Sequence, residues 1–389
     1  MECPDSGTWN HHFLSPSHTS APDFVNRHLP DFVAYHLAIL LLTTCRAFSR
    51  CTIQAAPDLV LLHSMNMYPT ILGAVFMFLA FSSAVISMCA AGVLLLLIGL
   101  WAAKSDVARA RGLDKIVALA NLCFAMPLAV FGTEHFALAG TIMQLVPKFV
   151  PWHLFWTYFV GVGLLAASLS IGTKIQVRWS GLLFGIMMFL FVAMMDLPGT
   201  LADVHNRISW ALLCRELSFG AGGWMLAATA IGDRQAQTRR TLTTVGRLLI
   251  GVAALLYGVE HFLHPINVPG VPLEKFMPAW IPARWLISYL TGVILLISGA
   301  SILVAKKTRE AATYLGTWIL LLVVFIYGPI LIASLLDPNA AVQIEGINYF
   351  FDTLLYAGTI LALAAANPLP DLQVDSQREH SLSASARSA

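Results

Sequence analysis

Charged side chains stand inside long apolar segments of this sequence, where they could carry chemistry. Such residues are rare in segments that suit a membrane interior, and where they occur they form proton relays, solute sites or ion pairs between helices. Each is therefore a functional hypothesis. The candidate functional cluster consists of Glu134, His135, Asp196, Arg215, Glu216, Glu260, His261 and Asp352.

Arg215 needs a carboxylate partner, because an unpaired charge is very costly in a low-dielectric interior. We expect Arg215 to pair with Glu134 or Asp196 beneath the membrane surface. Glu216 is adjacent in sequence and points about 100° away around a helix, so we consider it a poorer partner. The alternative interpretation is a clamp between helices that has no chemistry.

His135 and His261 suggest a haem or a quinone as ligand. Two axial haem ligands must face each other, whereas these residues end two different helices, so a histidine that only forms hydrogen bonds is the simpler interpretation. A quinone headgroup in an apolar cleft could be contacted by either histidine, with Tyr158 and Tyr289 as further quinone-contacting residues. We expect no metal site, because adjacent Glu and His diverge around a helix, unlike the E-x-x-H pattern of di-metal bundles.

The composition limits the class of protein. Of 389 residues, 58% are hydrophobic and 11% are charged, against about 25% charged in soluble domains. Such a chain cannot cover itself with a water-compatible surface, so we expect the lipid bilayer to be its solvent. The sequence has no basic stripe with interleaved aromatic residues, so nucleic acid is excluded as a partner.

The apolar segments predict an all-α, polytopic membrane helical bundle with about nine transmembrane helices. Each segment is long enough to cross a bilayer, and helices satisfy their own backbone hydrogen bonds in lipid. The predicted spans are about 75–102, 114–134, 153–173, 180–198, 208–231, 243–263, 284–304, 312–335 and 347–366.

The two ends of the chain differ from this pattern. Residues 1–64 contain one apolar run, Phe32 to Thr44, which is too short to span, and we expect this segment to be disordered or a mis-called start. Residues 367–389 are rich in serine and charge, which predicts a disordered cytoplasmic tail.

Lysine and arginine alternate between the two sets of loops and predict the orientation. Cytoplasmic loops carry the excess of these residues, so the N-terminus should lie outside and the C-terminus inside. The loops predicted to be cytoplasmic hold Lys104, Arg109, Arg111, Lys115, Lys174, Arg178, Arg234, Arg239, Arg240, Lys306, Lys307 and Arg309. The opposite loops hold Lys148, Arg207, Lys275 and Arg284.

The sequence contains an internal repeat. The segment FGTEHF at 131–136 matches YGVEHF at 257–262, and VPKFVP at 146–151 matches MPAWIP at 277–282. These matches predict two parallel four-helix repeats, at 111–233 and 241–366, behind a leading helix within 65–110. The second copy has about five extra residues in its first outer loop.

The copies have also diverged at their charged positions. Glu216 matches Asp352, whereas Arg215 matches Phe351. One copy could therefore keep an ionic lock and the other a proton-accepting carboxylate.

The motif G-x-E-H-F, then [VM]-P-x-[FW]-[VI]-P, then Y-x-x-G, resembles the DoxX/DoxD-like membrane protein superfamily over about residues 114–366. Two copies look like a double DoxX-like unit. Members are associated with a thiosulfate:quinone oxidoreductase subunit and with membrane partners of redox proteins. The resemblance implies a multi-pass protein of the bacterial inner membrane, linked to quinone or to thiol and sulfur redox chemistry.

Three functional hypotheses follow. The first is a redox-associated subunit, at most a quinone-linked oxidoreductase subunit, with quinone as cofactor and a membrane or periplasmic redox protein as partner. The second is a small-solute binding or transport module that uses the outer charged cluster. The third is a structural membrane subunit without its own activity.

Overall fold

The computed structural model describes residues 82–271 and 273–367 of the chain. In these residues every named element is a helix. The predicted N-terminal segment 1–64 and, apart from Asn367, the predicted tail 367–389 lie outside the described residues.

Eight helices of the described residues are long and apolar enough to cross a membrane. Their bounds are Ser83–Arg109 (α4), Asp114–Ala137 (α5 and α6), His153–Gly172 (α8), Val177–Ala202 (α9, η2 and α10), Ala236–Leu263 (α12), Arg284–Leu303 (α13), Thr308–Leu335 (α14, η4 and α15) and Ala340–Ala366 (α16). Each coincides with a predicted span, although α4 begins and ends later than the predicted 75–102.

The remaining predicted span, 208–231, coincides with α11 (Arg207–Thr229), which is not among these eight helices. Arg215, Glu216 and several small residues lower its hydropathy. Much of α11 is buried against other helices, including Ala211, Phe219 and Met225. The side chains of Arg215 and Glu216 are only 17% and 16% exposed, so they too face protein.

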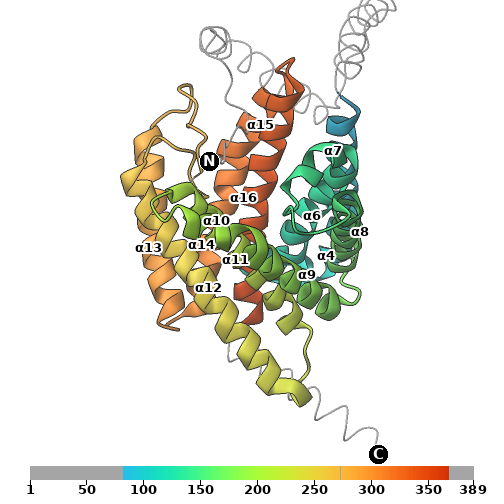
Figure 1. Ribbon diagram of the computed structural model, residues 1–389. Coiled ribbons are helices and arrows are strands. Elements are labelled where there is room, and N and C mark those ends of the chain that lie inside the picture. Colours follow the sequence, from blue (N-terminus) through green and yellow to red (C-terminus); the bar gives the residue numbers. More distant parts are fainter. Residues whose placement is uncertain (1–81, 272, 368–389) are drawn as a thin grey trace, which may run out of the picture. The chain divides into compact units, whose positions relative to one another are not determined.

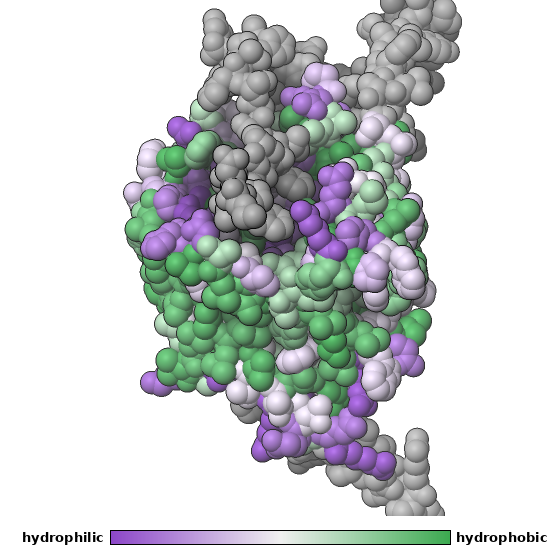
Figure 2. Space-filling view, in the orientation of Figure 1, coloured by the Kyte–Doolittle hydropathy of each residue, from purple (hydrophilic) through white to green (hydrophobic). Residues whose placement is uncertain are grey.

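Apolar side chains cover the outward-facing surfaces of the bundle. Figure 2 shows them as a belt across one face, with hydrophilic residues gathered at both ends. An exposed apolar surface of this extent is a liability in water and fits a lipid environment. The chain is therefore a multi-pass membrane protein. Examples of exposed residues are Leu97, Trp101, Phe159, Leu183, Leu286, Ile297 and Phe325.

The helices of the first half (114–229) and of the second half (236–366) pack in the same order. In the first half α6 packs on α8, α8 on α9, and α9 on α11; in the second half α12 packs on α13, α13 on α14, and α14 on α16. The first helix of each half packs mainly on the fourth helix of the other half: α6 packs on α16, and α12 packs on α11 (Figure 1). The fourth helices, α11 and α16, also pack on each other.

Close backbone contact fixes α11 against α9. A Cβ atom added at Gly181 would lie 2.4 Å from the carbonyl oxygen of Gly223. Only glycine fits at such a distance, and small residues commonly allow such close approach of helices in membrane proteins. The contact positions the first half's third and fourth helices, which carry Asp196 and Arg215.

Helix lengths, π-helical turns and positive-φ positions of the first half recur in the second half, each the same number of residues further along the chain. α8 and α13 are both 20 residues long, and each half interrupts its third helix with a π-helical turn. These turns are η2 (Val192–Asp196) and η4 (Val323–Tyr327). The non-glycine residues with positive φ recur at the same offset: Trp152, Lys174 and Gln176, then Ala283, Ala305 and Lys307.

Candidate functional site

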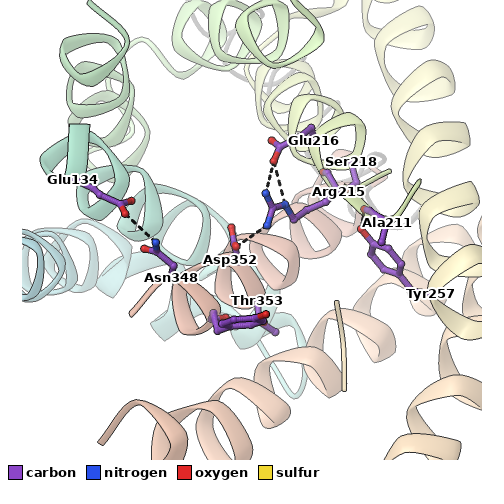
Figure 3. Close-up of polar contacts among 10 residues, drawn as sticks. Glu134, Ala211, Arg215, Glu216, Ser218, Tyr257, Asn348, Asp352 and Thr353 are labelled. Carbon is purple, nitrogen blue, oxygen red and sulfur yellow. Dashed lines mark hydrogen bonds and ion pairs between the residues drawn. The ribbon is translucent and has the colours of Figure 1, made fainter. Parts of the chain in front are cut away.

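Arg215 joins the two fourth helices through its guanidinium group. Its Nη1 donates to Asp352 Oδ2 on α16 at 2.8 Å, and its Nη2 donates to Glu216 Oε1 at 2.7 Å (Figure 3). Its Nε also donates to the same Glu216 oxygen, at 3.1 Å. The three side chains are each 16–17% exposed, so these charges are largely removed from solvent and depend on one another.

The expectation that Arg215 pairs with Glu134 or Asp196 is wrong. The helical angle between adjacent residues does not prevent the contact with Glu216, because the long arginine side chain bends back to reach it. Asp352 comes within reach because α16 of the second half packs directly on α11.

Glu134 forms a second polar contact on α16. Asn348 Nδ2 donates to Glu134 Oε1 at 2.9 Å, and Glu134 also interacts electrostatically with Asp352. Figure 3 shows the Asp352 carboxylate between the Glu134–Asn348 pair and the Arg215 guanidinium. The polar network therefore runs from α6 across α16 to α11.

Asp196 completes the cluster from the third helix of the first half. It ends the π-helical turn η2, and it interacts electrostatically with both Arg215 and Glu216. π-Helical turns within helices are frequent at functional sites, because they redirect side chains. The turn and Pro198 after it thus place a carboxylate beside the ion pair.

The cluster contains more acid than base. Glu216 and Asp352 pair with the guanidinium of Arg215, Asp196 interacts with it electrostatically, and Glu134 interacts with Asp352. Uncompensated negative charge is costly in a half-buried, membrane-embedded site. Protonation of the unpaired acids or a bound cation would remove this excess of negative charge.

Glu260 and His261 lie in a separate group on α12. Arg207 Nη1 at the start of α11 donates to Glu260 Oε2 at 3.0 Å. His261 Nδ1 is bonded to the Tyr257 carbonyl at 2.5 Å, and its Nε2 accepts from the Gly270 amide at 2.9 Å. Both ring nitrogens of His261 are thus occupied, with the proton on Nδ1.

His135 forms the same type of hydrogen bond within its helix as His261 does. Its Nδ1 is bonded to the Phe131 carbonyl at 2.7 Å. Gly161 packs against its Cβ, just as Gly292 packs against the Cβ of His261. The two histidines therefore adopt equivalent positions on α6 and α12.

The predicted quinone-contacting tyrosines lie outside both polar groups. Tyr158 stacks on Phe136 with ring centroids 5.5 Å apart, and Tyr289 stacks on Phe262 at 5.7 Å. Both tyrosines are 39% exposed. Their role toward a quinone stays a prediction. Within residues 82–271 and 273–367, no group of three or more His, Cys, Asp or Glu residues could hold a metal ion.

Sequence reasoning missed Asn348 and Arg207 as site residues. Asn348 stands one helical turn before Asp352 in an otherwise apolar stretch, which was a usable signal. The sequence predicts Arg207 only as a positive charge in a loop. Its partner Glu260 lies on α12 and comes within reach because α11 packs on α12.

Comparisons with protein-family models, curated proteins and solved structures find no match to this chain. The resemblance to DoxX-like proteins therefore stays a prediction.

Replacing Arg215 by Met should destabilise the protein by about 3–5 kcal/mol, because Glu216 and Asp352 would be left buried without their cation. The free energy of unfolding in mixed detergent micelles measures this loss. Adding Asp352→Asn should recover part of it, since the two residues are directly coupled.

The matched control is Arg109→Met, which removes an arginine whose side chain is 75% exposed and should change stability by less than about 0.5 kcal/mol. If Arg215→Met is no less stable than this control, the ion pair does not hold α11 to α16.

Proposed function

We propose that the chain is a protein of the bacterial inner membrane, built of two parallel four-helix repeats behind a leading helix, with α11 as a ninth span. Support comes from the matched sequence motifs and from the recurring helix lengths, π-helical turns and positive-φ positions. The equivalent packing of Gly161 on His135 and of Gly292 on His261 supports the same alignment.

We propose that the loops rich in lysine and arginine are cytoplasmic and that the cluster around Arg215 lies toward the outer face. In intact cells of a cysteine-free variant, a membrane-impermeant maleimide should label Ala279→Cys and leave Lys306→Cys unlabelled until the cells are lysed. Both positions are exposed. Labelling of the Lys306 position alone in intact cells would reverse the proposed orientation.

We propose that the Arg215 cluster binds a small, positively charged solute, in a binding or transport role. The observation that carries this proposal is the excess of four carboxylates over one guanidinium in a largely buried, membrane-embedded network. Ionisable residues at such positions in transport proteins line ion and solute pathways. Arg215 already pairs with Glu216 and Asp352, so Glu134 and Asp196 are the acids that we propose contact the solute.

Binding of a cation to the cluster should displace charge and give a transient current in proteoliposomes adsorbed on a solid-supported membrane. A panel of protons, sodium, potassium and small organic amines should include at least one that gives a saturable current. Glu134→Gln should raise the cation concentration that gives half-maximal current at least about tenfold, as expected when a direct charged contact worth about 1.4 kcal/mol or more is lost.

Glu345→Gln provides the control, because Glu345 is an exposed glutamate of α16 that pairs with Lys275 at 3.0 Å. Absence of current for the whole panel, or equal half-maximal concentrations in Glu134→Gln and Glu345→Gln, contradicts the proposed binding role.

A redox-associated role is the second candidate, and the stacked pairs Phe136–Tyr158 and Phe262–Tyr289 favour it. Flat aromatic surfaces at the lipid boundary suit a quinone ring. Protein purified from native membrane should then retain quinone, measured in its lipid extract, and Tyr158→Ala should retain less than Tyr314→Ala, which removes an exposed tyrosine elsewhere. Equal retention in the two variants contradicts this candidate.

A further inference from the structure

A cavity of about 160 Å³ lies where the helices α5 (Asp114–Val117) and α14 (Thr308–Leu322) begin. These helices also begin two of the candidate membrane spans. The cavity therefore lies at the boundary between lipid and water, at the level of lipid headgroups. Its lining residues include Arg111, Leu113, Asp114, Arg309, Glu310 and Tyr314.

Arg309 fixes the walls of this cavity. Its Nη2 donates to Asp114 Oδ1 at 2.7 Å, and its Nη1 donates to the Ala364 carbonyl of α16 at 2.9 Å. The arginine side chain is only 13% exposed. Arg309 thus joins α5, α14 and α16 around the cavity, and the carboxylate of Asp114 balances its charge.

Two further charged side chains of the lining have no such partner. Arg111 and Glu310 are both exposed, and neither side chain forms an ion pair or a hydrogen bond within residues 82–271 and 273–367. Leu113 and Tyr314 are 39% and 62% exposed, so the cavity is open to the surface. The cavity therefore presents one guanidinium and one carboxylate to a ligand.

A ligand that matches this lining carries a negative group and a positive group close together. A guanidinium pairs strongly with phosphate, and a carboxylate accepts hydrogen bonds from a primary ammonium group, which has three N–H donors. A phospholipid with an ammonium headgroup carries both groups. A purely anionic headgroup would instead bring a second negative charge to Glu310.

The size of the cavity suits the headgroup alone. A cavity of roughly 150 Å³ holds one benzene molecule, so this cavity has room for the charged groups, and the acyl chains would lie outside it in the bilayer. Tyrosine is common at this level of membrane proteins, where its ring contacts lipid and its hydroxyl contacts polar groups. Tyr314 is placed in this way beside the cavity.

We infer that an aminophospholipid binds in this cavity through its headgroup, with the phosphate at Arg111 and the ammonium group at Glu310. Leu113 and Tyr314 contact the part of the lipid that joins the headgroup to the acyl chains. A lipid held in this way connects the turn before α5 to the first turn of α14, next to the ion pair of Arg309 and Asp114.

Phosphatidylethanolamine is the probe, with phosphatidylcholine and phosphatidylglycerol of the same acyl chains for comparison. Native mass spectrometry of the delipidated full chain measures the dissociation constant of the first bound lipid. It should be at least about tenfold lower for phosphatidylethanolamine than for either other lipid, as expected when one charged hydrogen bond is lost. The methylated ammonium group of phosphatidylcholine has no N–H, and phosphatidylglycerol has no ammonium group.

Three variants test the assigned contacts. Glu310→Gln should reduce the preference for phosphatidylethanolamine to less than about twofold, and Arg111→Gln should weaken its binding at least about tenfold. Lys306→Gln is the control, because Lys306 is an exposed cation close to α14 that does not line the cavity. It should change the binding less than about twofold.

Equal affinities for the three lipids, or tighter binding of phosphatidylglycerol, overturn the inference using the unaltered protein alone. Equal losses in Arg111→Gln and Lys306→Gln also overturn it, because binding would then reflect surface charge. Glycerophosphoethanolamine has the same headgroup without acyl chains, and an equal concentration of it should leave the bound lipid in place. Displacement of the lipid would assign the cavity to a soluble ligand and overturn the inference.

Discussion

The guanidinium group of Arg215 joins the charged residues where α11 packs on α16. Arg215 reaches Glu216 on its own helix and Asp352 on α16, and both carboxylates are largely buried. Removing charges from water is unfavourable unless they meet partners of opposite sign. The approach of α11 to α16 is thus a condition for burying these acids at all. Arg215 does not pair with Glu134 and Asp196, the two further acids of the cluster.

Polar side chains also join the two halves of the molecule. The first helix of each half makes a polar contact with the fourth helix of the other, through Glu134 and Asn348 in one case and Glu260 and Arg207 in the other. Both glutamates belong to the E-H-F motif. The glutamate of each motif thus has a polar partner on the opposite half. The histidine of each motif instead forms a hydrogen bond through Nδ1 with a backbone carbonyl of its own helix.

The halves differ where the sequence has diverged. In the second half, a loop with extra residues enters the space beside His261, and an apolar Phe351 stands where the first half has Arg215. In the first half, His135 and Asp196 at the matched sequence positions are part-exposed. An apolar environment suits a backbone loop whose polar groups are hydrogen-bonded, as the amide of Gly270 and the carbonyl of Pro269 are.

The amino-acid sequence alone determined the membrane class and the positions of the eight candidate spans. It could do so because hydropathy is a property of each segment by itself. It also identified the ionisable residues that lie in those segments, among them Glu134, Asp196 and Asp352. Only the tertiary structure decided which of them meet. Arg215 pairs with Glu216 and Asp352 because α16 packs on α11, and the loop at Gly270 is buried because α12, α14 and α16 leave a place for it. Contacts between helices distant in sequence depend on how side chains of several segments pack together, and no local pattern of residues contains that information.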